Sequence, residues 1–149
     1  MTAPISAGAG FLLAVLWFDL MFDVQVRRHR EGDLPEEVLA SIAGYYRRVT
    51  TAARPMNRLV AAAMLATLAA IVVQIARGDE PRWVGWASLG LVGFAVALAA
   101  AHTVPAAVRL GGRHDPPDAQ SRLARSILRD HVLCFAAIAS TLVVQLGFG

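Results

Sequence analysis

The sequence predicts an all-α membrane protein: a polytopic four-helix bundle with an amphipathic interfacial helix between its first two spans. Hydrophobic residues make up 56% of the 149-residue chain, and the mean hydropathy is +0.52, which is too apolar for an ordinary soluble domain. Four apolar segments, at about residues 5–26, 55–76, 83–108 and 127–148, each reach the ~20 residues that a helix needs to cross about 30 Å of hydrocarbon. The chain is therefore expected to form a single integral membrane domain.

The basic side chains, all of them arginine, indicate the topology. Only Arg77 and Arg82 lie in the connection between the second and third spans. The other twelve flank the two longer connections: Arg27, Arg28, Arg30, Arg47, Arg48, Arg54, Arg58, Arg109, Arg113, Arg122, Arg125 and Arg129. Because arginine-rich loops stay in the cytoplasm, both termini are expected outside. The arginine-only, alanine-rich composition is typical of a bacterial chain, which predicts a multi-pass protein of the bacterial inner membrane.

The first span carries two acidic residues inside its apolar run. Asp19 and Asp23 are four residues apart, so a helix places them on one face. A charged side chain at bilayer depth costs about 3 kcal/mol on insertion scales, and such residues usually face a bundle interior or a wet cavity. The charges follow the apolar run instead of preceding it, which favours a retained span over a cleaved signal peptide.

Residues 34–50 are predicted to form the separate amphipathic helix. Pro35 suits a first helical turn, and the acidic pair Glu36 and Glu37 complements the positive end of the helix dipole. Its apolar residues recur at helical spacing, at Val38, Ile42, Tyr45 and Val49. The helix is expected to lie along the cytoplasmic interface or to cap the bundle. The alternative is an N-terminal extension of the second span, although Pro55 favours a break before it.

The second and third spans carry small residues at every fourth position, at Ala62, Ala66 and Ala70 and at Gly93, Ala97 and Ala101. Ridges of small residues let helices approach closely in a membrane, so these two spans are expected to pack together through them. Pro105 is expected to kink or to end the third span.

The polar residues of the spans are predicted to gather near one level of the bilayer. They are Asp19, Asp23, Asn57, Arg58, His102, Arg129 and His131. At 1.5 Å per residue, these positions fall within about two helical turns of each other. The remaining part of the bundle holds almost nothing ionisable. A polar intramembrane pocket that opens to the cytoplasm follows from this placement.

Three roles fit such a pocket. The aspartates and histidines are suitable ligands for a divalent metal. However, no HxxxH or ExxH spacing links any two of them, so no cofactor is expected. Alternatively, His102 or His131 is a general base tuned by Asp19 and Asp23. Lastly, the charges neutralise one another and only fix the packing of the bundle.

Three short motifs support a resemblance. The runs PMNRLV, AHTVPAAVRLGG and SRLARSILRDHVL resemble the small four-helix membrane proteins grouped with fungal anthrone oxygenases. The resemblance falls on Asn57, His102, Val104, Pro105, Arg129 and His131. It implies a four-span fold and, for the chemistry, a cofactor-independent oxidation of an aromatic polyketide by dioxygen. This chain departs from the group's pattern at Ala106 and Ala107, where a second asparagine is expected, and in having its histidine after Arg129.

The first hypothesis is a membrane protein with a small-molecule pocket, an oxygenase-like enzyme acting on a lipophilic aromatic molecule. His102 or His131 would be its base, and Asn57, Arg58 and Arg129 would bind the substrate, the arginines an anionic or enolate oxygen. A transporter or proton pathway is the second hypothesis. The third is a structural subunit of a membrane complex, for which the pocket should be filled by the protein's own side chains.

The expected partners follow from the same features. They are the lipid bilayer and a lipophilic small molecule, with a homo-oligomer left open. The sequence has no nucleic-acid motif, so its net charge of +3 is explained by the arginine-rich loops and no nucleic-acid partner is expected. A single cysteine, Cys134, excludes an internal disulfide and is expected to be a packing residue.

Overall fold

The computed structural model describes residues 2–29, 31–52, 54–79 and 81–149, and within these ranges it is helical with no strand. Four of the described helical segments are long and apolar enough to cross a membrane: Thr2–Arg28, Pro55–Arg77, Arg82–Gly112 and Pro117–Phe148. The prediction of an all-α multi-pass membrane protein is therefore confirmed. Arg30 and the side chain of Arg54, both counted among the predicted cytoplasmic arginines, lie outside the described residues.

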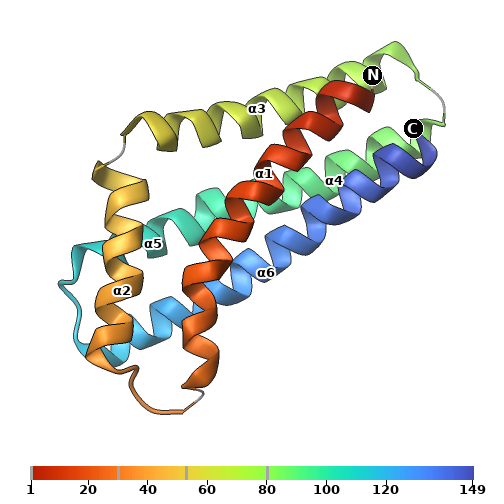
Figure 1. Ribbon diagram of the computed structural model, residues 1–149. Coiled ribbons are helices and arrows are strands. Elements are labelled where there is room, and N and C mark those ends of the chain that lie inside the picture. The colour runs from red at the N-terminus through yellow and green to blue at the C-terminus, as the bar shows by residue number, and fades with distance from the viewer. Residues whose placement is uncertain (1, 30, 53, 80) are drawn as a thin grey trace.

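The helices follow one another along the chain with short connections. They are α1 (Thr2–Asp23) with a 3-10 turn η1 (Val24–Arg28), α2 (Glu36–Tyr46) with a π-helical segment η2 (Arg47–Ala52), α3 (Arg54–Arg77), α4 (Arg82–Leu98) with a π-helical segment η3 (Ala99–Thr103), α5 (Val104–Gly112) and α6 (Pro117–Phe148). Both termini lie at one end of the bundle, and α2 lies at the other (Figure 1). We refer to these as the terminal end and the α2 end.

Two hydrophobic cores occupy the two ends. The membrane core joins α1, α3, α4 and α6 through Ile5, Ala9, Leu12, Ile71, Val92, Ala95, Cys134, Ala137 and Ile138. The cap joins α2, α5 and the first turns of α6 through Val26, Leu34, Leu39, Ile42, Ala43, Tyr46, Ala106, Ala107, Leu110, Ala124 and Ile127. The 32 residues of α6 run about 48 Å through both cores. Since hydrocarbon spans only about 30 Å, the cap extends beyond it.

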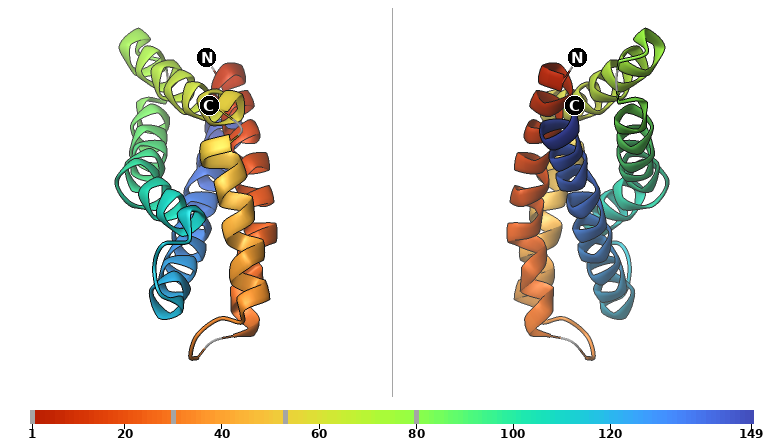
Figure 2. Two further views of the ribbon diagram at one scale, coloured as in Figure 1. Left: turned by 90° about the vertical axis from the view of Figure 1, so that its left-hand side faces the viewer. Right: turned by 90° about the vertical axis from the view of Figure 1, so that its right-hand side faces the viewer.

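The helix predicted at residues 34–50 is a packed member of the cap. Figure 2 shows α2 running beside the last turns of α1. Leu39, Ile42 and Tyr46 are at most 2% exposed, because this stripe packs inward instead of lying on a lipid surface. The connection before α2 is fixed to α6, where Ser121 accepts a hydrogen bond from the Leu34 amide at 2.9 Å and Arg125 donates to carbonyl oxygens of that connection. The expectation of a cap is thereby met, and the helix continues from α2 through η2 to Ala52.

The third and fourth spans are longer than predicted. Pro105 does not end the third span, because the π-helical turn of η3 precedes it and α5 continues to Gly112. A π-helical turn accommodates the carbonyl that the proline ring would otherwise crowd. The last span begins at Pro117, ten residues before the predicted 127, because its polar first turns pack Ser121, Ala124 and Ile127 into the cap.

The predicted contact between small-residue ridges is wrong. Ala62 and Ala66 of α3 and Ala97 and Ala101 of α4 and η3 are exposed. The two helices instead approach closely at Gly85, where an added Cβ would overlap the Ile75 side chain. Lipid tails are themselves apolar, so no hydrophobic force drives a ridge of alanines toward the protein interior.

Candidate functional site

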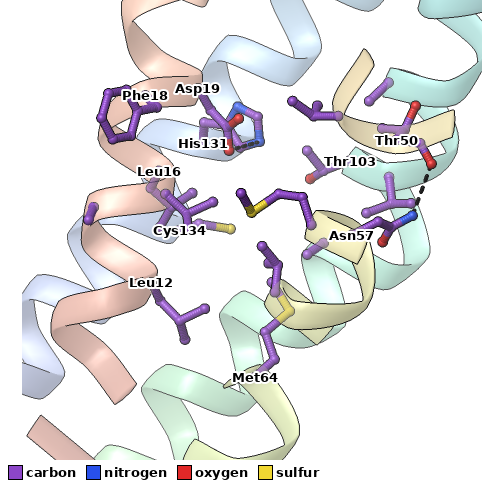
Figure 3. Close-up of a pocket in the computed structure, with 18 of the residues that line it drawn as sticks. Leu12, Leu16, Phe18, Asp19, Thr50, Asn57, Met64, Thr103, His131 and Cys134 are labelled. Carbon is purple, nitrogen blue, oxygen red and sulfur yellow. Dashed lines mark hydrogen bonds and ion pairs between the residues drawn. The ribbon is translucent and has the colours of Figure 1, made fainter. Parts of the chain in front are cut away.

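His131 of α6 lies between the two carboxylates of α1. Its Nδ1 is 2.7 Å from Oδ2 of Asp23, and its Nε2 is 3.8 Å from Oδ2 of Asp19. Asp23 is fully buried and His131 is buried as well. Because a carboxylate accepts hydrogen bonds, Nδ1 is the donor to Asp23, and this bond fixes the ring so that Nε2 faces Asp19. Figure 3 shows Asp19 and His131 pointing toward one another.

Two adjacent tyrosines of α2 complete this group. The Tyr45 hydroxyl donates to Oδ1 of Asp19 at 2.6 Å, and the Tyr46 hydroxyl donates to Oδ1 of Asp23 at 2.6 Å. Burial, followed by the charges of the two carboxylates, raises the pKa of both phenols above the ordinary value. Both tyrosines therefore remain hydrogen-bond donors at neutral pH. Together Asp19, Asp23, Tyr45, Tyr46 and His131 form what we call the polar cluster, which links α1, α2 and α6.

A second group forms around Asp130, the residue before His131. Its carboxylate is fully buried and is bonded to Nδ1 of His102 and, at 3.2 Å, to the hydroxyl of Thr103. Arg129 approaches the other carboxylate oxygen at 3.5 Å, but its side chain is 69% exposed. The π-helical turn of η3 directs two successive residues, His102 and Thr103, at the same carboxylate oxygen. π-helical turns often occur at functional sites.

A cavity of about 480 Å³ lies beside the polar cluster, and residues of α1, α2, η2, α3, α4, η3, α5 and α6 line it (Figure 3). Its polar wall is formed by Asp19, Tyr45, Tyr46, Thr103 and His131. Most of the remaining wall is apolar and includes Leu12, Leu16, Val60, Met64, Ala95, Cys134 and Ile138. Cavities of about 300–1,000 Å³ with an apolar lining and a few convergent polar groups are the usual binding sites of small molecules.

The structure brings only some of the sequence-predicted residues together. Asp19, Asp23 and His131 form one group, whereas His102 lies with Asp130 in the other. Asn57 is at the edge of the cavity, where its side-chain amide donates to the Thr50 carbonyl at 3.0 Å. Arg58 is exposed and lines no part of the cavity, and Arg129 is bonded to Asp130.

Sequence reasoning missed Tyr45, Tyr46, Thr103 and Asp130 as site residues. The tyrosines were recognised only as part of an apolar face, although two adjacent phenols on a helix that caps a polar pocket are a usable signal. Asp130 sits beside arginines in the sequence and resembles a solvated residue there. Its burial depends on the packing of η3 against α6, which the sequence pattern does not reveal.

The terminal end also holds buried polar groups, which were not expected. The Gln145 side chain donates at 2.9 Å to both the Gln74 side chain and the Ser88 hydroxyl, and all three residues are buried in the membrane core. These groups are uncharged and bond to one another. They join α3, α4 and α6 near the terminal end.

Within the described ranges, no group of three or more histidine, cysteine or acidic side chains is arranged to hold a metal ion. The Nδ1 of His131 is already engaged by Asp23, which leaves only Nε2 and Asp19 directed at the cavity. Comparisons with protein-family models, with curated proteins and with solved structures find no match for this chain. The resemblance to anthrone-oxygenase-like proteins therefore stays a proposal.

Proposed function

We propose that this membrane protein binds a lipophilic small molecule in the cavity and exchanges a proton with it at Nε2 of His131. The observation that carries this proposal is the position of Nε2, which faces a largely apolar cavity while Asp23 holds the opposite nitrogen of the ring. A histidine that is oriented by a carboxylate at one nitrogen is well suited to proton transfer at the other. Asp19, whose Oδ2 is 3.8 Å from Nε2, faces the same point of the cavity without a direct hydrogen bond to the ring.

An oxygenase-like enzyme is the form of this function that the sequence resemblance favours. Such a reaction would begin with removal of a proton from an activated carbon of the substrate, and dioxygen would be the oxidant. The polar cluster offers the base, and the apolar wall offers surroundings with little water, in which a base is more effective. The arginines do not line the cavity, so a developing negative charge would be stabilised by the His131 ring once it has taken up the proton.

The two other functions fit the site less well. A purely structural polar cluster would be surrounded by the protein's own side chains, whereas a 480 Å³ cavity lies against Asp19 and His131. For proton permeation, Gln74, Ser88 and Gln145 offer polar groups at the terminal end. Those groups satisfy one another and do not line the cavity. Proton flux into liposomes would be the observation in favour of permeation.

The orientation and membrane are part of the same proposal. We place the α2 end in the cytoplasm and both termini outside the bacterial inner membrane, because the arginines concentrate at the α2 end. The cavity then belongs to the cytoplasmic half of the bilayer.

The test is to identify what the protein carries when it is purified from membranes. The organic extract of the wild type should contain a lipophilic compound in near-equal molar amount, as measured by mass spectrometry. Val60→Trp on α3 places an indole in the cavity and should remove the compound, because Val60 lines the cavity. Leu65→Trp, on the same helix, is the matched control because Leu65 is 65% exposed and lies outside the lining. Identical extracts from the wild type, Val60→Trp and empty lipid particles would contradict the proposal.

A further inference from the structure

We propose that the cavity is loaded sideways from the bilayer, through an opening between α1 and α3, and that its ligand is a lipophile with a neutral hydroxyl head group. This inference rests on the proposed function, since it names the route and the chemical class of the ligand for the same cavity.

Residues that line the cavity and are also exposed show where it reaches the surface of the protein. On α1 these include Phe11 and Phe18, which are 37% and 60% exposed; on α3 they include Met56 and Leu59, which are 50% and 52% exposed. All four side chains are apolar and belong to spans, so in a membrane the surface beside them is lipid. A water-soluble ligand would have to pass this apolar rim, whereas a lipophile is already concentrated there.

The opening follows from how α1 and α3 cross. They approach each other closely at Gly8, where an added Cβ would overlap the Thr67 side chain. From this point the two helices separate toward the α2 end (Figure 1). The η2 segment closes the far edge, where Asn57 donates to the Thr50 carbonyl. The gap is therefore bounded by a tight crossing on one side and by η2 on the other.

The polar wall selects the head group. Nε2 of His131 and Oδ2 of Asp19 are 3.8 Å apart, too far for a hydrogen bond between them. A hydroxyl can donate to one of these atoms and accept from the other, so it fits the gap in either protonation state of the pair. An anionic head group would instead meet the carboxylate of Asp19, with no arginine in the cavity lining.

The apolar body of the ligand would then extend along the remaining wall. Leu12, Met64 and Ile138 continue that wall away from the polar cluster. The opening between α1 and α3 adjoins this apolar wall. A hydrocarbon chain attached to the hydroxyl can therefore stay in contact with apolar side chains from the site to the bilayer. Keeping the chain in apolar surroundings avoids the desolvation cost of carrying it through water.

The single cysteine of the chain makes this route measurable. Cys134 lines the cavity one helical turn after His131, so a thiol reagent reports on the cavity without background from other thiols. In lipid nanodiscs at alkaline pH, a long-chain alkyl maleimide dissolved in the bilayer should modify wild-type Cys134, as followed by mass spectrometry. A sulfonated maleimide of the same reactivity, which stays in water, should react much more slowly.

Tryptophans at the opening provide the decisive comparison. Ala14 and Leu59 face the opening from α1 and α3, and the variant Ala14→Trp with Leu59→Trp should slow the alkyl maleimide at least about tenfold, because two indoles overfill the gap. Leu65→Trp on the lipid-facing side of α3 should leave the rate unchanged, as should Val108→Trp on α5, because both residues are exposed and neither lines the cavity. If the double variant does not fold, as judged by gel filtration and circular dichroism, each single tryptophan should still slow the reaction.

The head group is tested with two probes of equal chain length. Dodecanol should protect Cys134 from the maleimide, and dodecanoate, which carries a carboxylate, should not. Equal protection by both would overturn the hydroxyl assignment. An unchanged rate in the double variant, equal slowing by Leu65→Trp or Val108→Trp, or faster reaction with the sulfonated reagent would overturn the route. These outcomes are independent of the compound found on purification, whose absence would contradict the proposed function while leaving the route intact.

Discussion

The 2.7 Å bond between Nδ1 of His131 and Oδ2 of Asp23 joins the last span to the first at a point that is closed to solvent. Replacing Asp23 with Asn turns one of its two acceptor oxygens into an NH2 donor, so the Tyr46 hydroxyl and Nδ1 of His131 can no longer both donate to it. We expect Asp23→Asn to lower the free energy of unfolding in detergent by about 1–3 kcal/mol. The same change should abolish retention of the copurified ligand. Full stability together with full ligand content in this variant would show that Asp23 does not position His131.

The two tyrosines should differ in their contributions. Tyr46 is 2% exposed and its hydroxyl donates to Asp23, whereas Tyr45 is only partly buried and donates to Asp19. Because a buried unsatisfied acceptor costs more than a partly hydrated one, Tyr46→Phe should destabilise the protein by about 1–2 kcal/mol and Tyr45→Phe by less. Thermal unfolding of both variants in the same detergent measures the difference. The reverse order would mean that Asp19, not Asp23, is the less hydrated carboxylate.

High pH should unfold the protein through these phenols. The chain has no lysine and only two tyrosines, so few side chains titrate above about pH 9. The pKa of Tyr45 and of Tyr46 is raised in the folded protein, mainly by burial. The unfolded state therefore loses protons first, and the stability from these groups is complete below about pH 10 and falls as the pH rises further.

The measurement for this pH dependence is a series of unfolding curves between neutral and strongly alkaline pH. We expect the loss of stability to be shallower in the double variant Tyr45→Phe, Tyr46→Phe, which has no phenol to titrate. A double variant that loses stability as steeply as the wild type would place the alkaline transition elsewhere.

Of the two side chains that pair with Asp130, His102 should contribute more to stability than Arg129. His102→Ala removes a partner from a fully buried carboxylate, so we expect a loss of about 1–3 kcal/mol. Arg129→Gln should cost little, because the Arg129 side chain is 69% exposed and exposed ion pairs contribute about 0–1 kcal/mol. Unfolding of the two variants side by side checks this. Equal losses would indicate that Arg129 neutralises Asp130 despite its exposure.

The stability contributions of Gln74 and Gln145 in the membrane core should depend on each other, because their side chains are bonded to one another. Gln145→Leu alone leaves Gln74 and Ser88 without their shared partner and should destabilise the protein by about 1–3 kcal/mol. Adding Gln74→Leu should recover much of that loss, since both members of the bond are then apolar. A double-mutant cycle should therefore show a double variant that is less destabilised than the sum of the two single variants. Additive losses would argue that the two side chains do not depend on one another.

The spans were predictable because the bilayer imposes a strong condition on the sequence. Every helix that crosses must be apolar over about twenty residues, whatever it packs against. The meeting of Asp19 and Asp23 with His131 was partly predictable for a similar reason. Charged groups in a span seek partners, and those on neighbouring helices at the same depth are the candidates.

Which face of a span turns inward was harder to predict. Apolar residues are stable on both the lipid side and the protein side, so the ridge at Ala62 and Ala66 could not reveal that it faces outward. The π-helical turn before Pro105 changes the direction of every following side chain. His102, which lies within this turn, bonds to Asp130 instead of joining the polar cluster.

The central claim is that His131 presents Nε2 to a ligand in the cavity while Asp23 holds Nδ1. Nitrogen NMR of histidine-labelled protein in nanodiscs tests it directly, with the His131→Gln spectrum used to assign the signals among the four histidines. We expect Nδ1 to carry a proton with and without dodecanol, and the Nε2 signal to shift when dodecanol is added. An Nδ1 without a proton, or a His131 spectrum that dodecanol leaves unchanged, would contradict it.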